Sequence, residues 1–364
     1  MVSRIVVLTI QPLTEVEPRD RNDIRRRTMN RFQRRLVLIG FVLSTCFGAV
    51  HESAGQSSSL TAFYTAPVVS MAPMWIAKEA GFFKKHGLDV KLVFIASGPL
   101  GTTAILSGDV DVGIIGGFAP TRAIAGGAKN LVMIGQSKNR MTGAIVGKKE
   151  IASVQDLKGK RLGIDRVGSN PDMFTQAALS RFQLDPLKDL QYIQLGSIGQ
   201  GIPALKAGTI DALTTSTPHD LFAQRLGFKV ILDITAMKIP FASTVLASAR
   251  NTVERKQPEL TRFMRAYAEA VHYFLTNREG TGQIVAKYTK VEDREVVAFS
   301  IESEAAAVEK TLQVDPKGIE LILELIGRSM PQAAAAKPQD FYDPRFFNEL
   351  RDSGFLKRLW GDKL

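Results

Sequence analysis

The sequence VDVGIIGGFAPTRAIA, at residues 110–125, decides the fold predicted for this chain. Residues 110–115 form a mostly apolar run of the length that predicts a buried strand. Gly116 and Gly117 follow as a tight turn, and residues 120–125 predict a short helix that begins at Pro120. A buried strand that turns directly into a helix is typical of a parallel sheet with helices on both faces.

The same alternation of strand and helix continues on both sides of this stretch. Before it, strands are predicted at residues 60–65 and 88–95, and helices are predicted from Pro73 and through residues 98–106. After it, residues 131–134 predict another strand. Elements of these lengths in this order indicate an α/β unit.

The pattern starts again after Met141 and predicts a second α/β unit. Its predicted strands are at residues 144–146, 161–164, 190–195, 212–214 and 230–232, and its predicted helices are at residues 154–157, 168–182, 202–207 and 218–226. An extended apolar run at residues 240–249 follows. The remainder, residues 252–364, is largely helical, with a low-complexity loop at residues 333–338.

We therefore expect an α/β protein with two lobes, mainly parallel sheets flanked by helices, and a helical C-terminal tail. Residues 56–140 and 241–364 are predicted to form lobe 1 with the tail, and residues 141–240 to form lobe 2. The short connections at residues 137–144 and 233–241 are predicted to act as paired hinges. Residues 1–55 are assigned to an N-terminal extension and signal sequence.

That extension has the features of an export signal. Three Arg and no acid at residues 30–35 precede an apolar run at residues 36–50, and small residues follow at residues 53–55. This is the order of a secretory signal, and the apolar run is shorter than the roughly 20 residues of a membrane-spanning helix. The chain is thus predicted to be periplasmic. A lipid anchor at Cys46 is an alternative, and whether Met1 or Met29 is the true start stays open.

Composition argues against several other classes of protein. The net charge is +11, and the first 55 residues, with nine Arg and five acids, contribute four of these charges. The remaining Lys and Arg are scattered among acids without a basic stripe interleaved with aromatics, so no nucleic-acid partner is predicted. Cys46 is the only cysteine, and His86, His219 and His272 are widely spaced, so no metal and no cofactor are predicted.

Catalytic patterns are missing from the sequence. It contains no G-x-S-x-G elbow, no H-E-x-x-H, no P-loop and no dinucleotide-binding glycine fingerprint. Asp109 and Asp111 suggest paired carboxylates, but we interpret them as a solvated turn and a cap, because residues 208–211 repeat the same turn. The sequence therefore predicts a protein that is not an enzyme.

Small polar residues recur in six loops where predicted strands lead into helices, at the same edge of the two sheets. The loops are residues 64–70, 97–98, 116–118, 168–170, 199–200 and 214–217. Helix N-termini at that edge expose backbone N–H groups that suit polar or anionic ligands. Each residue alone is explained as an N-cap worth about 1 kcal/mol, whereas the set together favours ligand binding. The predicted ligand-binding residues are Tyr64, Ser97, Gly98, Gly117, Phe118, Ser169, Asn170, Gln200, Thr215 and Ser216. The loops contain no Arg or Lys that would fix a sulfonate or nitrate, and the closest is Arg166.

Five motifs resemble those of the nitrate/sulfonate/taurine-type substrate-binding proteins of ABC importers. They lie at residues 72–90, 104–111, 156–163, 204–212 and 342–355, and the resemblance spans about residues 60–360. It implies a type II periplasmic-binding-protein fold whose hinged lobes close on a ligand. It also implies ligand contacts at Tyr64, Ser97, Gly117, Ser169, Asn170 and Thr215.

The resulting hypothesis is a monomeric solute-binding receptor. It would capture a small polar or anionic organic, nitrogen or sulfur compound and deliver it to an ABC permease in the membrane. The alternative is an enzyme on the same fold, of the pyrimidine-precursor or menaquinone-pathway type. The first type needs a cysteine-rich motif, and the second is cytosolic, which the export signal contradicts. A sensor ectodomain is a third interpretation, but no membrane-spanning or signalling segment follows.

Overall fold

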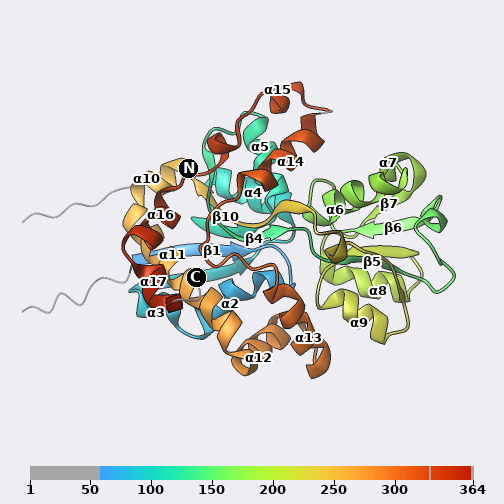
Figure 1. The fold of residues 1–364 in the computed structure, drawn as a ribbon, viewed down its shortest axis with the longest axis horizontal. Coiled ribbons are helices and arrows are strands. Elements are labelled where there is room, and N and C mark those ends of the chain that lie inside the picture. The colour runs from blue at the N-terminus through green and yellow to red at the C-terminus, as the bar shows by residue number, and fades with distance from the viewer. Residues whose placement is uncertain (1–57, 328, 362–364) are drawn as a thin grey trace, which may run out of the picture. The chain divides into compact units, whose positions relative to one another are not determined.

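The computed structural model describes residues 58–327 and 329–361, so the predicted signal sequence and Cys46 lie outside the described residues (Figure 1). The described residues form two five-stranded sheets, with the strand orders β2-β1-β3-β10-β4 and β7-β6-β8-β5-β9. The first sheet consists of β1 (Ser58–Tyr64), β2 (Leu88–Phe94), β3 (Val112–Ile115), β4 (Leu131–Arg140) and β10 (Pro240–Ala249). The second consists of β5 (Ala144–Gly147), β6 (Arg161–Ile164), β7 (Gln191–Gln194), β8 (Ala212–Thr215) and β9 (Lys229–Asp233).

Both sheets are mixed. In the first, β1 pairs in parallel with β2 and β3, and in the second, β6 pairs in parallel with β7 and β8. By contrast, β10 and β5 run antiparallel to both of their neighbours. Each sheet therefore has four strands in one direction and one in the other. The predicted α/β fold is confirmed, and the single reversed strand in each sheet is an addition to it.

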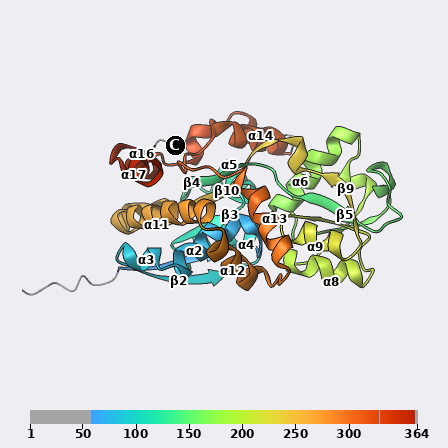
Figure 2. The same ribbon diagram turned by 60° about the horizontal axis from the view of Figure 1, so that its bottom comes forward.

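Helices cover both faces of the first sheet because its strands alternate apolar side chains between two cores. Ala62 of β1 belongs to the core that contains Trp75, whereas its neighbour Phe63 belongs to the core that contains Ile105. On the face of Ala62 pack α2 (Ala72–Glu79) and α11 (Gln257–Thr276), and on the face of Phe63 pack α4 (Gly98–Ser107), α5 (Phe118–Ala125) and α14 (Pro316–Gly327) (Figure 2).

The second sheet is covered in the same way. Ile145 of β5 packs with the core that contains Phe174, and its neighbours Ala144 and Val146 pack with the core that contains Ile202. The corresponding helices are α6 (Asn170–Leu179) and α7 (Pro186–Asp189) on one face, and α8 (Gly201–Lys206) and α9 (His219–Arg225) on the other (Figure 1).

The predicted helical C-terminal region is confirmed, and no helix among the described residues is both long and apolar enough to span a membrane. The remaining helices are α3 (Phe82–Lys85), α10 (Arg250–Arg255), α12 (Arg278–Thr289), α13 (Arg294–Ala305), α15 (Pro331–Ala334), α16 (Arg345–Asp352) and α17 (Phe355–Trp360). Short 3-10 helices are η1 (Val69–Met71), η2 (Gln155–Leu157), η3 (Ser180–Phe182), η4 (Ile198–Gln200), η5 (Thr235–Met237) and η6 (Pro338–Phe341). The predicted loop at residues 333–338 is thus partly helical.

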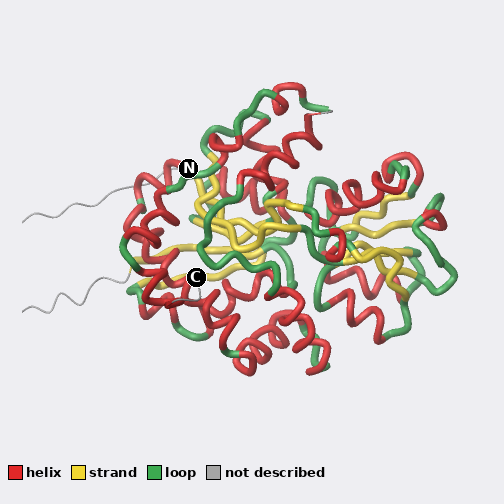
Figure 3. Tube along the Cα trace, in the orientation of Figure 1, coloured by secondary structure: helices red, strands yellow, loops and turns green. Residues whose placement is uncertain are grey.

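Two connections that lie side by side join the sheets, at residues 141–143 and 234–239 (Figure 3). The N–H of Met141 donates to the carbonyl of Ile239 at 2.9 Å. Strand β4 runs six residues beyond the predicted end at residue 134, because β10 pairs with it from Leu131 to Arg140. Backbone pairing with β10 therefore keeps the polar end of β4 extended.

The two sheets repeat one structural device at the start of their central strands. The carboxylate of Asp111 accepts a hydrogen bond from the N–H of Thr61 at 2.8 Å, and that of Asp211 accepts one from the N–H of Arg161 at 3.1 Å. Lys256 pairs with Asp111 at 2.7 Å, and Lys148 pairs with Asp211 at 2.7 Å. These contacts assign both aspartates to the architecture of the sheets.

Candidate ligand-binding site

A small polar cavity lies where the carboxyl ends of strands from both sheets meet. Its volume is about 60 Å³. The loops after β1, β2, β3, β6, β7 and β8 contribute to its wall, together with residues of β4 and β10. The lining residues are Thr65, Ala66, Val68, Ser70, Met71, Ser97, Gly98, Gly116, Lys138, Asp165, Ser169, Asn170, Pro171, Phe174, Ile198, Ser216, Ser243 and Thr244.

Two ten-residue helices begin at this cavity, and their N-cap serines differ. Ser169, before α6, accepts a hydrogen bond from the N–H of Asp172 and donates its hydroxyl to Asp165. Ser97, before α4, makes no side-chain capping bond, and its buried hydroxyl has no partner among the described residues. Capping therefore accounts for Ser169 and leaves the hydroxyl of Ser97 unexplained.

The backbone of Ser97 is strained as well. Its φ of 80° and ψ of 155° lie in a region that glycine occupies easily and other residues rarely adopt. Its N–H donates to the carbonyl of Thr65 at 3.1 Å, which holds the residue in place beside the cavity. Strain of this kind costs about 1–3 kcal/mol and is typical of binding and catalytic sites.

We predict that Ser97→Gly stabilises the protein by about 1–2 kcal/mol, because glycine adopts this backbone without strain. The same substitution should weaken ligand binding by about tenfold, since it removes one hydroxyl hydrogen bond. Urea denaturation and calorimetric titration measure the two effects. Ser97→Ala is the matched control, because it removes the hydroxyl and keeps the strain. A Ser97→Gly protein that gains stability and binds as tightly as wild type would contradict a ligand contact at Ser97.

Asn170, the first residue of α6, connects the two sheets across the cavity. Its Nδ2 donates to the carbonyl of Ser243 in β10 at 2.6 Å, and its buried Oδ1 has no partner among the described residues. The side chain also lies against Gly116, where a Cβ atom would come within 2.4 Å of Asn170. Asn170 therefore connects the two sheets through Nδ2 and places Oδ1, a hydrogen-bond acceptor, beside Gly116 of the cavity wall.

Among the described residues that line the cavity, Asp165 is the only carboxylate, and 7% of it is exposed. Burial raises its pKa from the usual 3.8 to about 6, against hydrogen bonds from the Ser169 hydroxyl and the Arg166 N–H that lower it. Because the folded-state pKa is raised, the folded protein holds a proton that the unfolded chain releases between about pH 4 and pH 6. The contribution of Asp165 to stability therefore falls as pH rises through that window.

We predict that Asp165→Asn removes this part of the pH dependence, since an asparagine oxygen still accepts from Ser169 but does not titrate. Between pH 4 and pH 7 the wild type should lose up to about 3 kcal/mol relative to the variant, because one pKa unit corresponds to about 1.4 kcal/mol. Urea denaturation of both proteins across this range isolates the effect of Asp165. Parallel pH profiles for the two proteins would contradict it.

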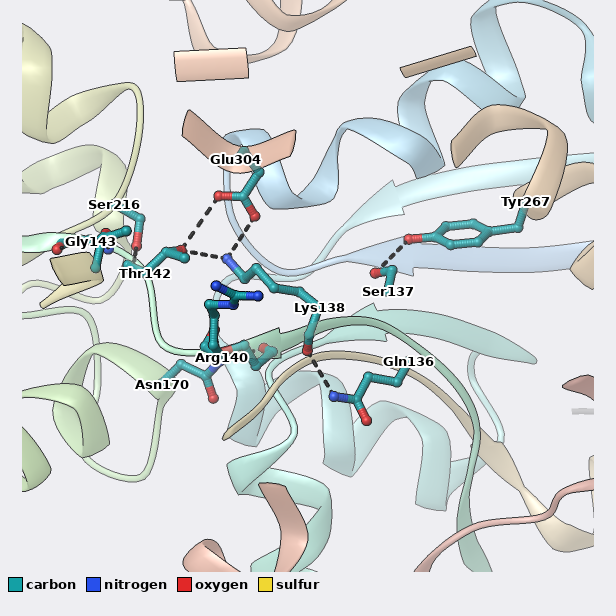
Figure 4. Close-up of polar contacts among 12 residues, drawn as sticks. Gln136, Ser137, Lys138, Arg140, Thr142, Gly143, Asn170, Ser216, Tyr267 and Glu304 are labelled. Carbon is teal, nitrogen blue, oxygen red and sulfur yellow. Dashed lines mark hydrogen bonds and ion pairs between the residues drawn. The ribbon is translucent and has the colours of Figure 1, made fainter. Parts of the chain in front are cut away.

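The positive charge of the site comes from Lys138 in β4. Lys138 is 4% exposed, and its Nζ lies 2.7 Å from Oε1 of Glu304 and 2.7 Å from the hydroxyl of Thr142 (Figure 4). The six predicted loops contain no Arg or Lys. Lys138 instead lies in the part of β4 beyond residue 134, within the segment 137–144 that was predicted to be a connection between the lobes.

The structure brings half of the predicted ligand-binding residues together. Ser97, Gly98, Ser169, Asn170 and Ser216 all line the cavity. Their functional assignment stays a prediction, because geometry alone does not identify a ligand contact.

The other five predicted residues lie outside the cavity wall. Tyr64 packs its ring against Trp75, Phe94 and Tyr288, Phe118 is buried in the core, and Gln200 is exposed. Gly117 lies against β10, where a Cβ atom would come within 2.2 Å of the Ala242 carbonyl oxygen, so close strand packing explains this glycine. Thr215 is buried beside Ser216, and its hydroxyl has no partner among the described residues.

Six polar residues of the wall were not among the predicted ligand-binding residues: Thr65, Ser70, Lys138, Asp165, Ser243 and Thr244. Ser243 and Thr244 interrupt the apolar run at residues 240–249, and that interruption was the available signal. Asp165 directly follows the predicted strand at residues 161–164, just as Ser97 comes two positions after the predicted strand at residues 88–95. Lys138 carried no comparable signal, since its partner Glu304 is 166 residues away in the chain.

Two α/β sheets that present strand ends to one shared polar cavity define a class of solute-binding architecture. Within it, the chain belongs to the NMT1/THI5-like family, whose model matches residues 69–280. YtlA of Bacillus subtilis (strain 168) is 25% identical over 256 residues, which cover 66% of this chain and 74% of YtlA. The resemblance that the motifs predicted is thus confirmed at the level of the family.

Solved structures support the same fold. The alkanesulfonate-binding protein SsuA from Xanthomonas axonopodis pv. citri matches with a TM-score of 0.66 and 19% identity, over 78% of this chain and 96% of SsuA. The periplasmic nitrate-binding protein NrtA from Synechocystis PCC 6803 matches with a TM-score of 0.68 and 16% identity, over 85% of this chain and 91% of NrtA. At these identities the similarity establishes the fold and not the ligand.

Proposed function

We propose that this protein is an extracytoplasmic receptor that binds a small polar or anionic solute and delivers it to an ABC importer. The observation that carries the proposal is the cavity at the strand ends of both sheets, where the buried hydroxyl of Ser97 and the Oδ1 of Asn170 have no hydrogen-bond partner in the part of the chain that the structure describes. Buried polar atoms are nearly always hydrogen-bonded, so two free ones in or beside a shared cavity favour a bound solute.

In this proposal the two sheets are the cores of two lobes. Residues 56–140 and 241–364 form lobe 1 with its helical tail, residues 141–240 form lobe 2, and the connections at residues 141–143 and 234–239 are the hinge. Drug-sized pockets begin at roughly 300 Å³, so the cavity of about 60 Å³ suits a compact solute in the closed arrangement. Separation of the lobes would admit the solute and release it.

The relatives support a transport role. SsuA binds an alkanesulfonate and NrtA binds nitrate, as their names state, and NrtA is periplasmic. We extend a periplasmic location and a permease partner to this chain on that basis and on the export signal expected in residues 1–55. An enzymatic role on the same fold is disfavoured, because the cavity wall holds one carboxylate, one amine and no His or Cys.

A thermal-shift screen of the purified protein against small anions, amines and neutral metabolites tests the proposal. A true solute should raise the melting temperature in proportion to the logarithm of its concentration above Kd. The same solute should be recovered unchanged after prolonged incubation. Conversion of a hit into a product, or a complete screen without a hit, would count against a transport receptor.

A further inference from the structure

Lys138, in the wall of the candidate site, forms a buried ion pair with Glu304, which does not itself line the cavity. The side chains are 5% and 3% exposed, and Nζ lies 2.7 Å from Oε1 (Figure 4). The Lys138 ammonium also donates to the hydroxyl of Thr142, in the connection that joins β4 to β5. These two contacts use two of the three N–H donors of a lysine, and Lys138 lines the cavity.

The backbone that carries Lys138 is held on several sides. The side-chain Nε2 of Gln136 donates to the Lys138 carbonyl at 3.0 Å, and the Oε1 of Gln136 accepts from the N–H of Asp315 at 2.8 Å. The hydroxyl of Tyr267 donates to Ser137 at 3.1 Å (Figure 4). Lys138 itself pairs with Thr244 of β10. The ammonium is therefore positioned before any solute arrives.

Stability does not explain this pair. Burial of two charges costs several kcal/mol of desolvation, and a pair of apolar side chains of the same volume is often at least as stabilising. A charged residue that is held rigidly at a cavity wall is instead typical of a site that reads the charge of its ligand.

The surroundings of Lys138 favour a negative solute. The N-termini of α4 and α6 begin at the cavity and bring partial positive charge to it, and the free hydroxyl of Ser97 marks one of them as open to a ligand. Arg140 lies two residues after Lys138 in the same strand, β4. The opposing carboxylate in the wall, Asp165, accepts the Ser169 hydroxyl, and Glu304 is occupied by Lys138 and Thr142.

We propose that Lys138 is the specificity-determining residue of this site and binds the anionic group of a compact solute, with Glu304 as its resident counter-ion. The inference rests on the proposed function and names the charge class of the solute. Glu304 is the counter-ion of Lys138 in the ligand-free site, and a solute anion accepts a hydrogen bond from the third donor of the ammonium. A neutral solute gains less from that donor, and a cation is repelled by it.

The probes for this inference are three anions, two of them compared with an uncharged counterpart and one with a cation. Methanesulfonate is compared with dimethyl sulfone, acetate with acetamide, and nitrate with the cation guanidinium, all at constant ionic strength. Binding is followed by thermal shift and by calorimetric titration of the full chain. At least one anion should stabilise the wild type, and its uncharged or cationic counterpart should not.

Three variants connect the effect to Lys138. Glu304→Gln removes the carboxylate that competes for the Lys138 ammonium and keeps an amide acceptor, so anion binding should become tighter. Lys138→Met combined with Glu304→Leu removes both charges at similar volume, and binding of the anion should fall by about 10- to 100-fold. Arg278→Gln combined with Glu302→Gln also removes one ion pair without a change of net charge, at side chains that are 80% and 64% exposed, and should leave binding unchanged.

Three outcomes would overturn the inference: equal binding of an anion and its counterpart, unchanged anion binding by the double variant, or no response of the wild type to any of the anions. These outcomes are distinct from failure of the proposed function. If the wider screen finds a neutral or cationic solute that binds without turnover, the receptor function stands and only the role of Lys138 falls.

Discussion

Replacement of Gly116 by alanine is expected to weaken solute binding by about 10- to 100-fold, with the melting temperature of the ligand-free protein changed by no more than about 2 °C. The nearest atoms to a Cβ at this position all belong to Asn170, with Cγ and Oδ1 at 2.4 Å. Gly116 follows β3 of the first sheet and Asn170 begins α6 of the second. The methyl group therefore opposes the approach of the two sheets.

The size of this effect follows from what Asn170 would have to give up. To make room, its amide must leave the carbonyl of Ser243, to which Nδ2 donates at 2.6 Å. A buried hydrogen-bonding group left without its partner costs about 1–3 kcal/mol, which corresponds to the stated loss of affinity. In the proposed open arrangement the lobes are separated and Gly116 would not meet Asn170, so we expect the ligand-free protein to tolerate the alanine.

Gly117→Ala is the matched control for this experiment. A Cβ at Gly117 would come within 2.2 Å of the backbone oxygen of Ala242, and both residues belong to the first sheet and its adjoining helix. Backbone does not move aside as a side chain does, so Gly117→Ala should lower the melting temperature with or without a solute. If Gly116→Ala behaved in the same way, or left affinity unchanged, the closure of two lobes around this cavity would be contradicted.

The fold was predictable because its signals are local. An apolar strand, a small-residue turn and a helix start follow one another within residues 110–125, and the same order recurs along both units. The loops at the carboxyl edge were predictable for the same reason, and Ser97, Ser169 and Ser216 were found in this way. Local pattern did not distinguish Ser169, which caps its helix, from Ser97, which does not.

The features that escaped prediction all depend on contacts between distant parts of the chain. Strand β10 enters the first sheet between β3 and β4, and only that placement decides its direction and extends β4 to Arg140. Tyr64 ends β1, one residue before the predicted end at residue 65, but its ring packs against Tyr288, more than two hundred residues later, and does not line the cavity. Glu304 lies on α13, whose approach to β4 no local pattern indicates.

The largest stability effect is expected at the Lys138–Glu304 pair. Glu304→Leu alone should lower the free energy of unfolding by about 3–5 kcal/mol, because it leaves the Lys138 ammonium buried without its counter-ion. Lys138→Met alone should cost a similar amount, since it strands the carboxylate of Glu304, which is 3% exposed. Each value reflects the desolvation of one unpaired charge, so it does not give the net contribution of the ion pair to the free energy of unfolding.

The double variant separates these two quantities. Lys138→Met with Glu304→Leu removes both buried charges and fills the same space with apolar atoms, so its free energy of unfolding should lie within about 1 kcal/mol of the wild type or above it. Urea denaturation of the four proteins gives the coupling energy directly. A double variant as unstable as the single ones would mean that the pair is retained to hold α13 against β4. A stable double variant would mean that the fold does not require the two charges. Binding of the solute would then explain why the site contains them.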